Sequence, residues 1–252
     1  MTYRVLNTRP MPMAMELEQA LRQYQLASVL YPVVENKALQ ADFPDWANFL
    51  SDGSCHWVFI SKPAVRFFNQ FLATQGIDNF NPAGEVFGVG PSTKAELETS
   101  YSKLHVLLPN ESNSEALLTM PELLSAKRVV LVKGRGGRGL IQQELQRHNI
   151  KVVELDLYQR CTTKYNETEM SDWLSCDLIM ATSVDIAKAI FDNLKQLPLS
   201  VSQEFLQNKA WLVLSERIKA FLMQHSIPAK HIYVCDQSDN SSIIKLIQQL
   251  AK

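Results

Sequence analysis

Residues 128–158 read RVVLVKGRGGRGLIQQELQRHNIKVVELDLY, and this stretch decides the fold class. An apolar run ends at Lys133, and a turn with glycines at positions 134, 136 and 139 follows it. The next residues are helix-like, because Ile141 and Leu145 share one helical face. A second β-branched run, KVVELDLY, closes the stretch. A strand, a turn, a helix and a strand in this order are typical of a right-handed βαβ unit in a parallel sheet.

The same alternation extends along the whole chain and predicts an α/β fold. Short β-branched runs, most of them followed by helical stretches, predict ten strands. Ten strands in 252 residues suit two five-stranded parallel sheets better than one sheet. The expected strands are Arg4–Asn7, Ala27–Val34, Trp57–Ile60, Val86–Val89, His105–Leu108, Arg128–Val132, Lys151–Leu157, Asp177–Ala181, Trp211–Leu214 and His231–Cys235.

An internal repeat supports two similar halves. RVLNTRP, from Arg4, resembles RVVLVKGR, from Arg128, and HVLLPNESNSEALL, from His105, aligns without gaps on HIYVCDQSDNSSII, from His231. The copies are shifted by roughly 122–126 positions, which indicates an internal duplication. The alignment pairs Ser61 with Ser183 or its neighbour Thr182, and Thr93 with Ser215.

The bulk composition excludes several classes of protein. The 25 Lys and Arg residues balance 26 Asp and Glu residues, so nothing points to a nucleic-acid partner. No apolar run approaches the roughly 18–20 residues of a membrane span. The first residues lead directly into a strand, so we expect no signal peptide. The spacing of the four cysteines fits neither a zinc site nor a disulfide framework, which indicates reduced thiols in the cytosol.

The glycine run from Gly134 to Gly139 has three interpretations. It matches the dinucleotide fingerprint, with Glu154 and Asp156 near the end of the next strand, and would then hold a pyrophosphate. However, the unit lies in the middle of the chain, and the matching turn in the first copy, NTRPMPMAM, has no glycine. The glycines could instead allow only a tight turn, or they could form a site for a different anion.

The expected strand-to-helix junctions carry hydroxyl, amide and guanidinium groups. Each could simply cap a helix. Together they would lie at the carboxyl edges of parallel sheets, where ligands bind. Two such edges facing each other would line a cleft with donors and positive helix ends, which suits a ligand with many carboxylates. The junctions are Thr8-Arg9, Ser61-Lys62, Ser92-Thr93, Ser112-Asn113-Ser114, Thr182-Ser183, Ser215 and Ser238.

Few residues suggest acid–base catalysis. The five histidines are scattered, and no hydrolase or metalloprotease motif is present. Tyr158 ends the strand LDLY, where the chain should leave a domain. It could be an interface tyrosine with a half-buried ring, or it could have a functional role.

The order and spacing of several motifs resemble those of the uroporphyrinogen-III synthase family, across essentially the whole chain. The motifs are VLNTRP, FISKPAVRFF, FGVGPSTKAELE, VKGRGGRGLIQQELQRHNIKVVELDLYQR, IMATSVDIAKAIF and SIIKLIQQLAK. The resemblance implies two flavodoxin-like domains with parallel sheets, joined by a two-strand linker that the chain crosses twice. The domains would be residues 1–35 plus 162–252 and residues 38–157, with linker strands at 33–38 and 157–162.

The resemblance also implies an activity. The family cyclises the linear tetrapyrrole hydroxymethylbilane, inverting ring D and releasing water, without a metal, flavin or nucleotide. Tyr158 would be the catalytic proton donor. Seven residues would bind the substrate carboxylates: Arg9, Ser61, Thr93, Arg138, Thr182, Ser183 and Ser215. The chain departs from the family pattern at Ile60-Ser61, where Thr-Ser is common, and near Ser215, which lacks the G-x-x-T of Gly90–Thr93.

The implied partner is a small polycarboxylate tetrapyrrole, with no nucleic acid and no membrane. We expect a cytoplasmic monomer that makes transient contact with the preceding enzyme of its pathway. Two alternatives stay open at this point. One is a nucleotide-dependent oxidoreductase that uses the turn from Gly134 to Gly139, and the other is a two-domain binding protein without catalysis.

Overall fold

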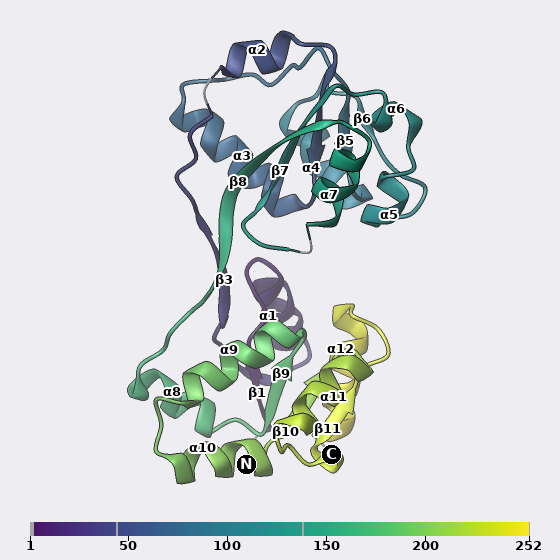
Figure 1. Ribbon diagram of the computed structural model, residues 1–252. Coiled ribbons are helices and arrows are strands. Elements are labelled where there is room, and N and C mark those ends of the chain that lie inside the picture. Colours follow the sequence, from purple (N-terminus) through teal and green to yellow (C-terminus); the bar gives the residue numbers. More distant parts are fainter. Residues whose placement is uncertain (1–2, 44, 138, 252) are drawn as a thin grey trace. The chain divides into compact units, whose positions relative to one another are not determined.

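A computed structural model describes residues 3–43, 45–137 and 139–251 of the chain. The chain divides into two compact units. Met1–Glu35 and Cys161–Lys252 form what we call the terminal unit, and Asn36–Arg160 forms the central unit. Each unit is a sheet with helices packed against it (Figure 1). No helix in the described part of the chain is long and apolar enough to cross a membrane.

The terminal unit is built on a parallel five-stranded sheet. The order is β11–β10–β9–β1–β2, with strands β1 (Arg4–Asn7), β2 (Ala27–Leu30), β9 (Leu178–Ala181), β10 (Ala210–Val213) and β11 (Ile232–Val234). Successive side chains of a strand face opposite cores, so Val5 and Leu6 of β1 lie in different clusters. Helices α1 (Met13–Gln23) and α12 (Asn240–Leu250) cover one face. Helices α8 (Glu167–Leu174), α9 (Val184–Leu194), α10 (Leu199–Asn208) and α11 (Glu216–Gln224) cover the other.

The central unit is built on a six-stranded sheet. The order is β3–β8–β7–β4–β5–β6, with strands β3 (Val34–Ala38), β4 (Cys55–Phe59), β5 (Val86–Gly88), β6 (Val106–Leu107), β7 (Arg128–Gly134) and β8 (Lys151–Thr162). An aromatic-rich core joins one face to α2 (Trp46–Ser51), α3 (Lys62–Thr74) and α4 (Pro91–Ser100). Helices α5 (Ser114–Leu117), α6 (Pro121–Leu124) and α7 (Leu140–Arg147) cover the other face.

The two sheets share one topology, which agrees with the internal repeat. If β7 is matched with β1 and β8 with β2, both sheets have the flavodoxin-like order 2-1-3-4-5. The strand order reverses between β1 and β9 in the terminal unit, and between β7 and β4 in the central unit. In such sheets ligands bind beyond the carboxyl ends of the strands at that reversal. The fold therefore places one candidate site on each unit.

The sixth strand of the central unit differs from the expected pair of five-stranded sheets. The run Ala27–Val34 breaks because Pro32 has no amide hydrogen for a ladder, and β3 begins at Val34. Strand β3 then lies beside β8, which continues to Thr162 (Figure 1). The unit boundaries, at 35/36 and 160/161, fall inside these two strands, to which the family resemblance assigns the linker.

Candidate functional site

Tyr158 of β8 forms the centre of the candidate site on the central unit. Its hydroxyl lies 3.0 Å from Ser61 Oγ, and either oxygen can be the donor. Its ring stacks on Phe67 of α3, with centroids 5.0 Å apart and planes 17° apart. Its carbonyl accepts the Arg135 N–H at 2.7 Å. The half-buried tyrosine therefore connects β8, the glycine turn and the first turns of α3.

Ser61 is the N-cap residue of α3, and its side chain explains why the helix begins at the next residue. Its backbone is extended, and its Oγ accepts the Ala64 N–H at 3.2 Å, so it caps the helix. Pro63 fits the first turn, where its missing N–H has no cost. The Tyr158 hydroxyl consequently lies at the positive end of a 13-residue helix, where a negative charge is favoured.

The glycine turn lies beside this tyrosine. Gly136 and Gly137 adopt φ values of 93° and 98°, which are unfavourable for any other residue. A hollow of about 200 Å³ lies against the turn, and its lining includes Ile60, Ser114 and Lys133. At the carboxyl edge of this sheet, the backbone of the glycine turn thus lies next to the hydroxyls of Tyr158 and Ser61.

Lys133 pairs with the two acids that a dinucleotide-binding site would need to be free. Its Nζ lies 2.8 Å from Glu154 Oε2 and 3.0 Å from Asp156 Oδ1. Burial lowers the pKa of Lys133, but the hydrogen bonds to Glu154 and Asp156 outweigh it, so the pKa is raised above 10.5. Because both acids are engaged by Lys133 within the protein, the nucleotide interpretation of the glycine run is not favoured.

Two other residues of the central unit were expected in the site. Thr93 is the third residue of α4 and is 3% exposed. Its alignment with Ser215 is wrong by three residues, because Gly90 has the N-cap position of α4 that Ser215 has in α11. Arg138 lies outside the described residues.

Arg9 forms the centre of the candidate site on the terminal unit. The residue is 8% exposed, and its Nε has no hydrogen-bond partner among the described residues. Nη1 donates to Asn240 Oδ1 at 2.7 Å, and Nη2 lies 3.6 Å from Met13 Sδ. Burial lowers the pKa of Arg9, and Glu16 opposes that change. The fold therefore holds a buried cation with an unused donor at the end of β1.

The other expected residues of this unit lie on the neighbouring strand ends. Ser183 follows β9 and caps α9, accepting the Ile186 N–H at 3.2 Å. Ser215 follows β10 and caps α11, accepting the Ile218 N–H at 3.4 Å. Thr182 is half-buried between β9 and Ser183. The structure thus gathers Arg9, Thr182, Ser183 and Ser215 at one edge, and Tyr158, Ser61 and Thr93 at an edge of the other unit.

Sequence reasoning missed Phe67, Lys133 and Asn240 as parts of these sites. Phe67 reads as one more apolar residue of a helix. Lys133 and Asn240 are single polar residues whose partners come from other elements. Only the position of Lys133, immediately before the glycine run, could have drawn attention to it. No group of three His, Cys, Asp or Glu in the described part of the chain has the arrangement of a metal site.

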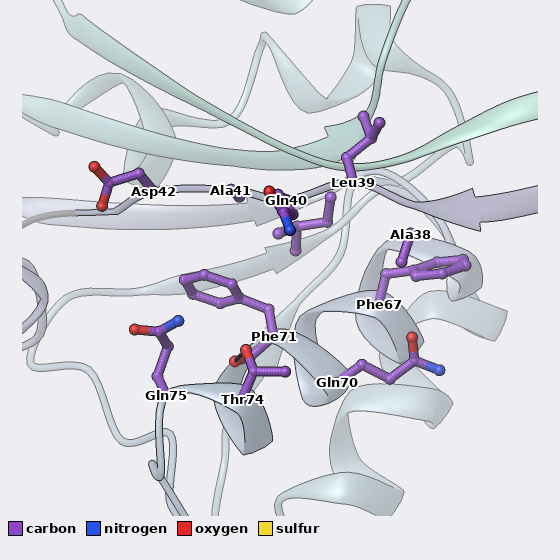
Figure 2. A pocket seen from close by; sticks show the side chains of 11 residues that line it. Ala38, Leu39, Gln40, Ala41, Asp42, Phe67, Gln70, Phe71, Thr74 and Gln75 are labelled. Atoms are coloured by element: carbon purple, nitrogen blue, oxygen red, sulfur yellow. Dashed lines mark hydrogen bonds between the residues drawn. The ribbon is translucent and has the colours of Figure 1, made fainter.

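A larger hollow has Phe67 in its lining. Phe67 and Phe71 of α3 face the chain segment 38–42 across it (Figure 2), and its volume is about 660 Å³. Asp42 is the one charged side chain in its described lining. A polycarboxylate would meet no positive charge there, so we place the candidate site at Tyr158 and not in this larger hollow.

Comparisons with known proteins agree on one family. The family model described as "Uroporphyrinogen-III synthase HemD" matches residues 15–245. The uroporphyrinogen-III synthase of Escherichia coli K12 is 28% identical, over 97% of this chain and 99% of that protein. The one from Salmonella typhimurium LT2 has the same identity and coverage.

Solved structures agree at the level of the fold. The uroporphyrinogen-III synthetase of Helicobacter pylori 26695 has a TM-score of 0.64 at 15% identity, covering 99% of this chain and 100% of that one. A mutant uroporphyrinogen III synthase from the extremely thermophilic bacterium Thermus thermophilus has a TM-score of 0.58 at 13% identity, with the same coverage.

Proposed function

The chain belongs to the uroporphyrinogen-III synthase family, and from this premise we propose that it cyclises hydroxymethylbilane to uroporphyrinogen III, with Tyr158 as the proton donor. It is a lyase-type enzyme of haem biosynthesis, which inverts ring D and releases water. The observation that carries the residue assignment is the 3.0 Å contact between the Tyr158 hydroxyl and Ser61 Oγ, at the N-terminus of α3.

The first chemical step is departure of the substrate hydroxyl. Tyr158 donates its proton to this oxygen, the carbon–oxygen bond breaks with its electron pair going to oxygen, and water leaves. A cationic azafulvene remains and is attacked when the ring closes. The tyrosinate formed on the enzyme is stabilised by the Ser61 hydroxyl and by the positive end of α3. A general acid in this position typically contributes about 10²–10⁴-fold to the rate.

The remaining residues hold the substrate in a ring-closing conformation. The substrate is flexible and bears eight carboxylates, so positioning alone lowers the barrier by several kcal/mol. Arg9 supplies a charge-assisted hydrogen bond from its guanidinium group, whose Nε has no partner among the described residues. Ser183, Ser215, Thr182 and Thr93 supply hydroxyls beside helix N-termini, and Arg138 a second guanidinium.

Product analysis tests the proposed function. Hydroxymethylbilane closes spontaneously to the type I isomer, so the purified protein should divert it to type III. Chromatography of the oxidised porphyrins measures the ratio. If only the type I isomer forms, the proposed function is wrong. Any enzymatic turnover removes the alternative of a binding protein without catalysis, and the lack of NAD(P)(H) binding at millimolar concentration removes the oxidoreductase.

Tyr158→Phe tests the proton donor. We expect turnover to fall by roughly 10²-fold, while the free energy of unfolding changes by less than about 1 kcal/mol, because the ring and its stacking remain. Tyr24→Phe, at an exposed position after α1, is the control. Wild-type turnover in Tyr158→Phe would remove Tyr158 from the mechanism.

We also propose a monomer in the cytoplasm that makes transient contact with the enzyme supplying its substrate. Cys55, Cys176 and Cys235 are free thiols. Burial raises the pKa of Cys55 to about 11 and that of Cys176 to about 12, so both remain thiols at neutral pH. Free thiols suit a reducing compartment. Light scattering would measure the mass in solution, and cell fractionation the location.

A further inference from the structure

Strand β8 contains an irregularity next to Tyr158. Lys133 pairs with Asp156, but the next residue of β7, Gly134, pairs with Tyr158, so β8 has one extra residue at Leu157. In a regular strand, neighbouring side chains point to opposite faces. Here Leu157 and Tyr158 both pack against the aromatic core beside α3. The bulge therefore turns Tyr158 toward α3, which a regular strand would not do.

Gly134 leaves room for the redirected ring. A Cβ at this position would lie 2.6 Å from both Cε2 and Cζ of Tyr158, whereas carbon atoms normally approach to about 3.5–4.0 Å. Cζ carries the hydroxyl, so any shift of the ring moves the hydroxyl. The backbone of Gly134 is in a region that other residues adopt, because its φ is not positive. The reason for a glycine here is the ring of Tyr158 and not the turn.

Phe67 and Ser61 constrain the same ring from α3. Phe67 stacks on it nearly parallel, at 5.0 Å, and Ser61 Oγ lies 3.0 Å from its oxygen. The three contacts come from β7, the helix and the helix cap, and all lie within the central unit. The ring plane and the direction of the hydroxyl are thus fixed before any ligand binds.

We propose that Gly134 and Phe67, together with the bulge in β8, are positioning residues that orient the Tyr158 hydroxyl for proton transfer. This inference rests on the proposed function. In the orientation we assign, Ser61 donates its hydrogen to the Tyr158 oxygen, while its own oxygen accepts the Ala64 N–H. The proton of Tyr158 then points to the leaving hydroxyl of the substrate, and after transfer the tyrosinate keeps its hydrogen bond to Ser61.

Gly134→Ala is the first test. We expect kcat to fall at least 10-fold with KM within twofold, because the ring gives way and the carboxylate contacts remain. The midpoint of urea unfolding should fall somewhat, because the ring that gives way is held by Phe67 and Ser61, so kcat is compared at a temperature at which both proteins are fully folded. Gly53→Ala is the matched control: its Cβ would meet only Ala83 O at 3.8 Å. Wild-type kcat in Gly134→Ala would overturn the proposal.

Phe67→Leu removes the stacked ring and should lower kcat. Phe67→Tyr keeps the stacked ring and should retain the wild-type kcat. A double-mutant cycle separates positioning from general damage. Gly134→Ala should cost nothing further in Tyr158→Phe, since it acts through the hydroxyl. If the two losses multiply, Gly134 does not act through Tyr158 and the proposal is wrong.

A spectroscopic measurement separates this inference from the proposed function. In protein labelled with [¹³Cζ]tyrosine, the Tyr158 signal is identified by its loss in Tyr158→Phe. Gly134→Ala and Phe67→Leu should shift that signal, and Gly53→Ala should not. If the wild type yields only the type I isomer, the function is wrong whatever this spectrum shows. If the signal is unmoved, the positioning contacts are wrong whatever the isomer ratio.

Discussion

Arg9 is a charged side chain that the fold buries with only part of its hydrogen-bonding capacity used. Its Nη1 donates to Asn240, but its Nε has no partner in the described chain. Burying an unpaired donor costs free energy, typically about 1–3 kcal/mol. Arg9 lies at the end of β1, where the strand order reverses and ligands bind in such sheets, and we propose that a substrate carboxylate pairs with its guanidinium group.

We therefore expect Arg9→Met to raise KM by roughly 10-fold or more, the value of one charge-assisted hydrogen bond. The free energy of unfolding should stay constant or rise, because methionine fills the space without a buried charge. Steady-state kinetics and urea unfolding measure the two quantities. Arg22→Met, at an exposed position of α1, is the control. An unchanged KM would exclude Arg9 from substrate binding.

Lys133 gives a prediction about alkaline pH. Its folded pKa is raised above the unfolded value of 10.5, so its ion pairs stabilise the protein fully below that value. The contribution is lost as the pH rises through the folded pKa. Lys133→Met should lower the free energy of unfolding by about 1–2 kcal/mol at pH 8, a range that allows for the partial exposure of both acids.

The difference between wild type and Lys133→Met should then shrink above pH 10.5, as urea titrations across the pH range would measure. Lys195→Met is the control, because its ion pair with Asp192 is exposed. A difference independent of pH would mean that Lys133 stabilises the protein by packing and not by charge.

At the scale of elements, several helix caps have two possible roles. Ser183 caps α9, and we propose that it also faces a substrate carboxylate. Asparagine and aspartate cap helices as well as serine does, and alanine does not. Only aspartate adds a negative charge, which would repel a carboxylate. The three substitutions therefore separate the capping role from the binding role.

Ser183→Ala should lower the free energy of unfolding by about 1 kcal/mol, while Ser183→Asn and Ser183→Asp should nearly preserve it. If Ser183 faces the substrate, the aspartate variant should have a clearly higher KM than the asparagine variant. Urea unfolding and steady-state kinetics give both values. Equal KM values for these two variants would reduce Ser183 to a helix cap.

The helices and strands also show how much of the fold can be predicted from the sequence. Periodicity predicted the α/β alternation, because most strands and helices have one clear apolar pattern. It did not predict β3, whose residues VENKA have no apolar alternation and are held by pairing with β8; only the family resemblance assigned a linker strand to residues 33–38. It also missed the bulge at Leu157, because KVVELDLY reads as a regular strand. Gly134 did signal something unusual, but the ring it accommodates lies 24 positions further on.

At the scale of the whole molecule, the two units share one topology although the chain leaves the terminal unit after β2 and returns to it before β9. The repeat showed that the first and sixth expected strands are equivalent. It could not show the strand order, which depends on contacts between distant segments. The crossing also explains why one unit is continuous and the other is not. Residues 36–160 include two hydrophobic clusters of their own, as does the terminal unit.

We accordingly predict that each unit folds alone. Residues 36–160 should give a cooperative urea transition when expressed without the rest.

The terminal unit needs a junction between its two segments. Residues 1–35 can be joined to 161–252 by an Asn-Gly turn, because the Thr163 N–H donates to Val33 O at 2.9 Å, while Leu39 N–H donates to Leu157 O at 2.9 Å. These pairings run antiparallel, so a two-residue hairpin turn suits the junction. Neither unit alone should form the type III isomer, because each carries only some of the residues to which we assign substrate binding and proton transfer. Circular dichroism during urea unfolding would test the folding, and a fragment without a cooperative transition would show that its unit depends on the other.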